Sequence, residues 1–219
     1  MTTLEQRIVE GYSARGLTLA IAETDSGGLA GYRITNVPGS SKVFPGAVTA
    51  YSNRVKMGVL GLPADLLREH GAVSAEAVLA MADGVRRVIG ADVGVAASGI
   101  AGPTGGTAEK PIGTVYVAIS REGDRRAERL HFSGDRLAVR AAFAEALLRL
   151  AVGVLDATDW SPRPPGRRQP QPKGKRPRRP LPPGAVSRIE ASLPPIQRLA
   201  TSFAVTPPAS WVVSVTTTR

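Results

Sequence analysis

Proline and basic residues are concentrated in the C-terminal part of the chain, which limits the part that can form a folded core. Residues 161–219 hold thirteen of the eighteen prolines and eleven Lys/Arg against a single acid. Residues 1–160 balance seventeen Lys/Arg with seventeen Asp/Glu, so the net charge of +10 belongs to the C-terminal part. Such a segment cannot bury enough apolar surface to offset its ordering entropy. We therefore expect a neutral globular domain over residues 1–158 and a disordered, basic, proline-rich tail over residues 159–219.

The composition of the chain argues against cysteine chemistry, metal sites and membrane insertion. It has no cysteine, so disulfides, thiolate metal sites and a cysteine nucleophile are excluded. The two histidines, His70 and His131, have no partners at the spacing of metal ligands. We therefore expect neither a metal nor a cofactor. The N-terminus lacks an apolar signal core and no apolar run reaches membrane-spanning length, so we expect a cytoplasmic protein with no membrane partner.

Stretches with helical periodicity alternate with short apolar runs in the first 158 residues. Helices are expected over 4–15, 29–34, 55–59, 77–89 and 135–155, and strands over 17–22, 48–51, 92–98, 113–120 and 127–132. Thr3 with Gln6, Ser74 and Asp135 are expected helix caps. The last helix is expected to turn inward Leu137, Ala141, Ala144, Leu147, Leu148 and Leu155. Alternating elements followed by a hairpin predict a layered α/β/α domain with a mixed β-sheet.

A glycine-dense connection, residues 98–107, joins two of the expected strands. Such a loop lets backbone N–H groups converge without interference from Cβ atoms, which suits anionic or carbonyl oxygens. It is neither a Walker loop nor a dinucleotide fingerprint, because it lacks the Gly-Lys-Ser/Thr ending and does not open a helix. A purely structural turn is the alternative interpretation.

Polar clusters stand at three expected strand ends, over residues 23–28, 51–56 and 98–110. Ligands of open α/β sheets bind beyond the carboxyl ends of the strands, so these clusters are expected to converge.

Lys56 is one of only three lysines in the first 160 residues, beside fourteen arginines. Burial can lower the pKa of a lysine until it serves as a base, and Thr24 and Ser26 offer hydroxyls that a base could activate. The alternatives are a solvated lysine on a helix surface and, for Ser26, a helix N-cap.

Over residues 4–155 the chain resembles the C-terminal domain of the competence-inducible protein CinA, also found as the stand-alone nicotinamide-nucleotide amidohydrolase PncC. The resemblance lies in residues 22–28 (Ala-Glu-Thr-Asp-Ser-Gly-Gly), 37–41 (Val-Pro-Gly-Ser-Ser), 51–53 (Tyr-Ser-Asn) with Lys56, 70–74 (His-Gly-Ala-Val-Ser), 98–103 (Ser-Gly-Ile-Ala-Gly-Pro), 105–107, 109–116, and 132–136 with Arg140.

This resemblance implies hydrolysis of the carboxamide of nicotinamide mononucleotide to nicotinic acid mononucleotide and ammonia, without a metal. The family's serine nucleophile falls on Thr24, its lysine base on Lys56, its assisting hydroxyl on Ser98, and its arginine on Arg140 or Arg136. The expected substrate-binding residues are Ser26, Gly27, Gly28, Tyr51, Asn53, Gly102, Gly105, Gly106 and Arg136. Backbone N–H groups around Gly27 and Gly28 are expected to donate to an oxyanion or phosphate.

The chain departs from the family in the first motif, where Glu-Ser-Cys-Thr-Gly-Gly is replaced by Glu-Thr-Asp-Ser-Gly-Gly. The extra methyl of Thr24 restricts its χ1 angle, and the carboxylate of Asp25 is expected to hold Lys56 protonated. Two functions follow: an amidohydrolase acting on a nucleotide, or a catalytically impaired nucleotide-binding or regulatory module.

Two expectations concern partners other than the nucleotide. A homo-oligomer is expected, and the basic run over residues 173–179 would give the tail weak, nonspecific contact with nucleic acid.

Overall fold

The computed structural model describes residues 2–156, so the expected tail and the domain limit at residue 158 lie outside the described residues. Its strands are β1 (Leu19–Glu23), β2 (Gly46–Thr49), β3 (Val93–Gly99), β4 (Thr114–Arg121) and β5 (Asp124–His131). The helices are α1 (Leu4–Arg15), α2 (Leu29–Thr35), the 3₁₀ turn η1 (Ser40–Lys42), α3 (Asn53–Gly58), α4 (Ala64–His70), α5 (Ala75–Ile89) and α6 (Arg136–Asp156).

The five strands form one mixed sheet in the order β2-β1-β3-β4-β5. Strand β1 pairs in parallel with both β2 and β3, whereas β4 runs antiparallel to β3 and forms a hairpin with β5. The connection from β1 leads to β2 on one side, and the chain then crosses to β3 on the other side of β1. The carboxyl ends of β1 and β3 therefore flank the point where the strand order reverses, which is where open α/β sheets bind ligands.

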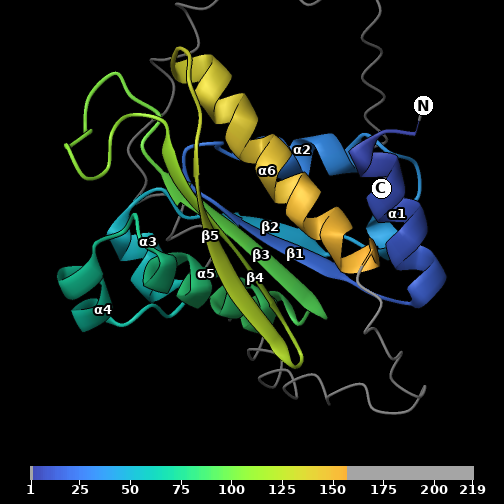
Figure 1. Cartoon of the computed structure of the whole chain (residues 1–219). Coiled ribbons are helices and arrows are strands. Elements are labelled where there is room, and N and C mark those ends of the chain that lie inside the picture. The colour runs from blue at the N-terminus through green and yellow to red at the C-terminus, as the bar shows by residue number, and fades with distance from the viewer. Residues whose placement is uncertain (1, 157–219) are drawn as a thin grey trace, which may run out of the picture. The chain divides into compact units, whose positions relative to one another are not determined.

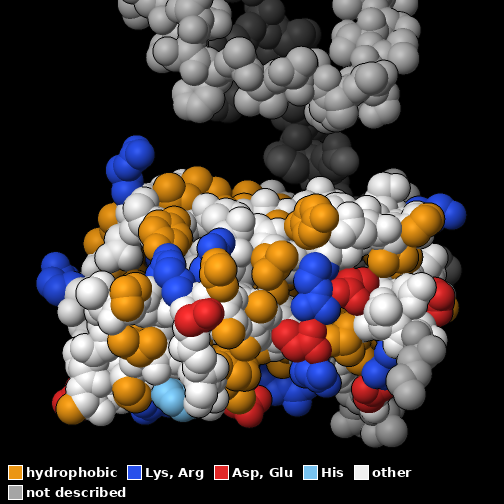
Figure 2. All heavy atoms as spheres, turned by 90° about the horizontal axis from the view of Figure 1, so that it is seen from above, with side chains coloured by type: hydrophobic (Ala, Val, Ile, Leu, Met, Phe, Trp, Pro, Cys, Tyr) orange, Lys and Arg blue, Asp and Glu red, His pale blue; other side chains and the backbone are white. Residues whose placement is uncertain are grey.

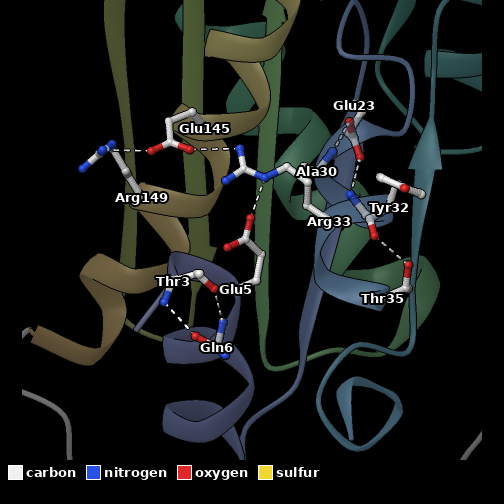
Figure 3. Close-up of polar contacts among 11 residues, drawn as sticks. Thr3, Glu5, Gln6, Glu23, Ala30, Tyr32, Arg33, Thr35, Glu145 and Arg149 are labelled. Atoms are coloured by element: carbon white, nitrogen blue, oxygen red, sulfur yellow. Dashed lines mark hydrogen bonds and ion pairs between the residues drawn. The ribbon is translucent and has the colours of Figure 1, made fainter. Parts of the chain in front are cut away.

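Helices cover both faces of the sheet and confirm the predicted layered α/β/α fold with a mixed β-sheet. Figure 1 shows α1, α2 and α6 on one face and α3, α4 and α5 on the other. In the first layer, the guanidinium of Arg33 in α2 joins Glu5 of α1 and Glu145 of α6 (Figure 3). One side chain thus links all three helices of that layer.

The two faces of the sheet differ in side-chain size. The face toward α1, α2 and α6 carries large residues such as Leu19, Ile21 and Ile119. The face toward α5 carries mainly alanine, namely Ala20, Ala22, Ala96 and Ala118. Gly94 completes this pattern, since a Cβ there would lie 2.3 Å from the carbonyl oxygen of Ala82 in α5. Small residues therefore let α5 pack with its backbone almost against the strands.

Most predicted elements and all three predicted caps are confirmed. The Thr3–Gln6 capping box opens α1, Ser74 Oγ accepts the N–H of Ala77, and Asp135 Oδ1 accepts the N–H of Ala138. The sequence analysis missed α4 and η1, and it placed β2 two residues too late.

The predicted inward face of α6 is wrong at its first turn. Leu137 is 69% exposed and Ala141 is also exposed, whereas Val139 and Phe143 are fully buried. At the N-terminal end of α6 the stripe that meets the core therefore runs through Val139 and Phe143, and Leu137 and Ala141 lie off it.

The described part of the surface carries both signs of charge. Seen from above in Figure 2, Lys/Arg and Asp/Glu side chains lie interspersed among hydrophobic ones. In residues 2–156, no helix is long and apolar enough to cross a bilayer.

We predict that Gly94→Ala lowers the free energy of unfolding by about 2 kcal/mol, because the new methyl must push α5 away from β3. The matched control is Gly153→Ala in α6, where a Cβ would meet no atom within 4 Å. Helix propensity alone should make that variant more stable by about 0.5–1 kcal/mol. Urea unfolding of both full-length variants measures the difference, and equal stability of the two would contradict the close approach of α5.

Candidate active site

The carboxylate of Glu23, at the end of β1, organises the turn that follows. Glu23 is fully buried, and it accepts the N–H groups of Gly28, Ala30 and Gly31 at 3.1, 3.2 and 3.0 Å. Figure 3 shows this carboxylate at the start of α2. It satisfies donors that a helix N-terminus would otherwise leave unpaired, and its negative charge suits that end of the helix dipole. The sequence analysis did not identify this role, for which the only signal is an acid at a strand end before Gly-Gly.

Residues 24–28 form a tight turn whose glycines are already engaged. Gly27 and Gly28 have φ angles of +67° and +96°, which favour glycine. The N–H of Gly27 donates to the Thr24 carbonyl at 3.0 Å, and the N–H of Gly28 donates to Glu23. The N–H groups of Gly27 and Gly28 are thus engaged within the turn, and the expectation that backbone N–H groups around them bind an oxyanion or phosphate stays a prediction. The N–H groups of Asp25 and Ser26 form no hydrogen bond with another described residue, so they are the donors left for that role.

Thr24 lies between the carboxyl ends of β1 and β3. Its side chain is only 2% exposed, and its hydroxyl lies 3.0 Å from Asp25 Oδ2 and 3.2 Å from the carbonyl oxygen of Ala97 in β3. A hydroxyl has one proton, so it donates to only one of these acceptors at a time. The candidate nucleophile thus stands in the crevice that the topology predicts.

Lys56, in α3, is buried rather than solvated, which rules out the alternative of a helix-surface lysine. It is 3% exposed, and its Nζ donates to the Tyr51 carbonyl at 3.3 Å. Burial lowers the pKa of Lys56 because the charged form loses hydration, while the nearby Asp25 carboxylate acts in the opposite direction. Burial prevails. The Asp25 carboxylate therefore opposes the effect of burial without cancelling it, and the expectation that it holds Lys56 protonated stays a prediction.

Ser98 and Lys110 hold the connection between α4 and α5 against the glycine-dense loop. Ser98 is buried, and its Oγ donates to the Ala72 carbonyl at 2.7 Å. Lys110 Nζ donates to the carbonyls of Val73 and His70 at 2.7 and 3.4 Å. In this arrangement the hydroxyl proton of Ser98 is committed to a loop carbonyl, while its lone pairs remain available.

Three of the expected substrate-binding residues contact one another. The guanidinium of Arg136 donates to the Gly102 carbonyl at 2.5 Å and to the Tyr51 hydroxyl at 3.2 Å. These residues come from α6, from the loop between β3 and β4, and from the segment before α3. Arg136 thus ties together three connections at one end of the sheet.

A pocket of about 390 Å³ lies beside the turn and is lined by Ser26, Gly27, Gly28, Leu29, Tyr32, Leu137 and Arg140. Arg140 Nε donates to the Asp25 carbonyl at 2.7 Å, which fixes the guanidinium at the pocket wall. The Ser26 hydroxyl is buried and has no hydrogen-bond partner among the described residues. The N-cap interpretation of Ser26 is wrong, because α2 is capped at Gly28 and the Glu23 carboxylate accepts its first N–H groups.

The structure does not gather all of the expected residues at this pocket. Thr24, Lys56 and Ser98 are buried and do not line it, and Asn53, Gly105 and Gly106 are exposed without lining it. Within residues 2–156, no three His, Asp or Glu side chains gather closely enough to hold a metal ion.

These features define an α/β protein whose candidate site lies at the carboxyl ends of its central parallel strands, where the buried hydroxyl of Thr24 follows the first strand. The CinA C-terminal domain model matches residues 1–155, and the chain belongs to this family. A CinA-like protein of Gemmatimonas aurantiaca is 48% identical over 155 residues, which cover 68% of this chain and 36% of that protein. A CinA-like protein of Dictyoglomus turgidum is 46% identical over 64% of this chain and 34% of its own length. The chain therefore spans about a third of the length of these relatives.

Solved structures give the same family. A competence-damaged protein (CinA) superfamily protein from Klebsiella pneumoniae superposes with a TM-score of 0.67 at 32% identity, covering 70% of this chain and 96% of that one. A competence/damage-inducible protein from Agrobacterium tumefaciens gives a TM-score of 0.67 at 34% identity, covering 70% of this chain and 94% of its own.

We predict that Glu23→Gln lowers the free energy of unfolding by about 2 kcal/mol or more, because charge-assisted hydrogen bonds to three N–H groups are lost. The amide has one acceptor oxygen and would point a donor at another donor. Glu10→Gln, on the exposed side of α1, is the matched control and should be neutral. Chemical denaturation gives the comparison, and an unchanged midpoint for Glu23→Gln would show that the carboxylate does not hold the turn.

Proposed function

We propose that the chain hydrolyses the carboxamide of nicotinamide mononucleotide to nicotinic acid mononucleotide and ammonia. The observation that carries this proposal is a buried hydroxyl, Thr24, and a buried lysine, Lys56, which both interact with Asp25. A hydroxyl nucleophile needs a base, and a lysine whose pKa is lowered by desolvation can be one. Family membership supports an amidohydrolase as the reaction class.

In the proposed reaction, Thr24 Oγ1 attacks the carboxamide carbon while its proton is removed, ultimately to Lys56. The oxyanion that forms accepts hydrogen bonds from the free N–H groups of Asp25 and Ser26, since the N–H after a nucleophile commonly serves this purpose. The C–N bond then breaks, the amide nitrogen takes a proton and leaves as ammonia, and water hydrolyses the resulting ester of Thr24. Ser98, at the end of β3, is proposed to assist through its free lone pairs.

The pocket beside the turn is proposed to hold the nucleotide. Arg140 supplies a fixed cation and Ser26 an unpartnered hydroxyl, which together suit a phosphate. The volume of about 390 Å³ falls in the range of small-molecule sites. Arg136, Tyr51 and Gly102 would close the neighbouring side. Asn53 would have to approach with α3, and Gly105 and Gly106 with the loop between β3 and β4.

The second candidate is a nucleotide-binding or regulatory module without turnover. It is favoured by the side chain of Thr24, whose extra methyl crowds a nucleophile that is already buried. A homo-oligomer, a cytoplasmic location and weak contact of the tail with nucleic acid stay predictions.

We predict that the wild-type chain releases ammonia from nicotinamide mononucleotide, and that Lys56→Arg and Thr24→Val each reduce kcat at least about 100-fold. Arginine keeps the charge of Lys56 but cannot serve as a base. Thr24→Ser should raise kcat, because the crowding methyl is removed. The control is Lys42→Arg at the exposed end of η1, which should leave kcat unchanged. A wild-type chain that binds the nucleotide in calorimetry but releases no ammonia would establish the second candidate instead.

The pH dependence gives an independent check on Lys56. Because burial lowers its pKa, the neutral amine forms at a lower pH than it does for a solvated lysine, whose pKa is 10.5. We predict that kcat rises with pH and reaches half its maximum below pH 10.5. A rate that falls as pH rises through this range would show that the ammonium form is the active one.

A further inference from the structure

We propose that Asp25 is the first acceptor of the Thr24 proton and passes it on to Lys56, so that the acid is a catalytic member of this site. The proposal rests on the function proposed above and deepens it. It concerns the position at which the chain carries an acid in place of the motif's cysteine.

The first argument is which acceptors the hydroxyl of Thr24 contacts. They are Asp25 Oδ2 at 3.0 Å and the Ala97 carbonyl at 3.2 Å, and only the carboxylate of these two is a base. Lys56 Nζ forms its hydrogen bond with the Tyr51 carbonyl and contacts neither Thr24 nor Asp25 directly. In this geometry the proton of Thr24 has no direct path to the amine.

The second argument is that the Asp25 carboxylate forms no ion pair with another described residue. Arg140, from α6, donates to the backbone carbonyl of Asp25 and not to its side chain. The other charged group is Lys56, from α3. The Asp25 carboxylate raises the pKa of Lys56 but forms no ion pair with it. Asp25 is also only partly buried, so its charge keeps some hydration. No arginine therefore neutralises this carboxylate, which remains an acceptor.

The third argument is positional. Thr24 is β-branched, so few χ1 values are open to it, and its contact with Asp25 selects one that points the hydroxyl toward the acid. Lys56 lies near enough for the Asp25 carboxylate to raise its pKa against the effect of burial. Asp25 thus contacts the hydroxyl of Thr24 and acts electrostatically on the amine of Lys56.

The proton balance of the step is complete. As Thr24 Oγ1 bonds to the carboxamide carbon, its O–H bond breaks and Asp25 Oδ2 takes the proton. The neutral amine of Lys56, turned from the Tyr51 carbonyl or joined through one water, then takes that proton and becomes an ammonium. Asp25 returns to its carboxylate form, and the proton leaves along the same route to the departing nitrogen.

Asp25→Asn separates this route from direct proton transfer to Lys56, because the two give opposite results. The amide oxygen can still accept a hydrogen bond from Thr24 but cannot hold its proton, so the relay predicts a loss of at least about 100-fold in Thr24 reactivity. If Lys56 acted directly, removal of the carboxylate would lower the pKa of Lys56 further and supply more neutral amine. Reactivity would then stay constant or rise.

The experiment measures the reactivity of Thr24 itself, so that it does not depend on turnover of the nucleotide. The full-length wild type, Asp25→Asn and Asp25→Glu are treated with diisopropyl fluorophosphate, and phosphorylation of Thr24 is followed by intact and peptide mass spectrometry. Asp65→Asn, an exposed acid in the first turn of α4, is the matched control and should react like the wild type. We expect Asp25→Asn to lose labelling and Asp25→Glu to recover part of it.

Labelling of Asp25→Asn at the wild-type rate or faster would overturn the relay, as would a wild type in which Thr24 is not labelled. Thermal unfolding of each variant shows whether the fold is kept, and Asp25→Ala, whose side chain cannot take a proton and which has the same expected loss, replaces any variant that unfolds. Ammonia release is measured separately. Labelling that depends on Asp25 in a chain that releases no ammonia would leave the relay intact and reject the proposed function.

Discussion

The buried carboxylate of Glu23 is the interaction on which the candidate site depends. It comes at the end of β1 and gathers three N–H groups from the start of α2, so strand and helix meet through one side chain. Between these two anchored points the chain has only residues 24–28 in which to turn. The direction of Thr24, the free N–H groups of Asp25 and Ser26, and the pocket wall at Gly27 and Gly28 all follow from this constraint.

The site draws on two layers that are held in different ways. Lys56 and Ser98 belong to the α3–α5 side, where α5 packs closely on alanines and Gly94 and the connection before it is held by Lys110. Arg140 belongs to α6 on the opposite side, whose layer is joined through Arg33. Thr24 lies where the two sides meet, at the end of the central strands. Asp25 connects the two sides, since its carboxylate acts on Lys56 and its backbone carbonyl accepts a hydrogen bond from Arg140.

The fold could be predicted from the sequence because local signals and packing agree along most of it. The apolar stripe of α5, the caps at Thr3 and Ser74 and the hairpin of β4 and β5 all depend on neighbouring residues. Leu137 was assigned to the core because two apolar stripes fit the start of α6, and periodicity does not show which of them faces the sheet. The short helix α4 was missed because its seven residues carry too little pattern.

The candidate site was only partly predictable. Family motifs drew attention to Thr24, Lys56 and Arg140, but their contacts depend on distances that no motif contains. The balance between burial and the Asp25 charge at Lys56 is decided by the packing of α3, not by sequence spacing. The role of Glu23 and the engagement of the Gly27 and Gly28 N–H groups appear only once the turn is closed.

The separation between the pocket and the buried Thr24–Lys56 pair has an evolutionary consequence. The pocket is built by the start of α2 and by α6, whereas the reacting groups come from the end of β1, from α3 and from β3. Substitutions among the pocket-lining residues can therefore accumulate without changing the positions of Thr24, Lys56 and Ser98, and the reverse also holds. A lineage with this architecture can exchange the proposed nucleophile at position 24 and its neighbour at position 25 while the pocket proposed to hold the ligand stays under separate selection.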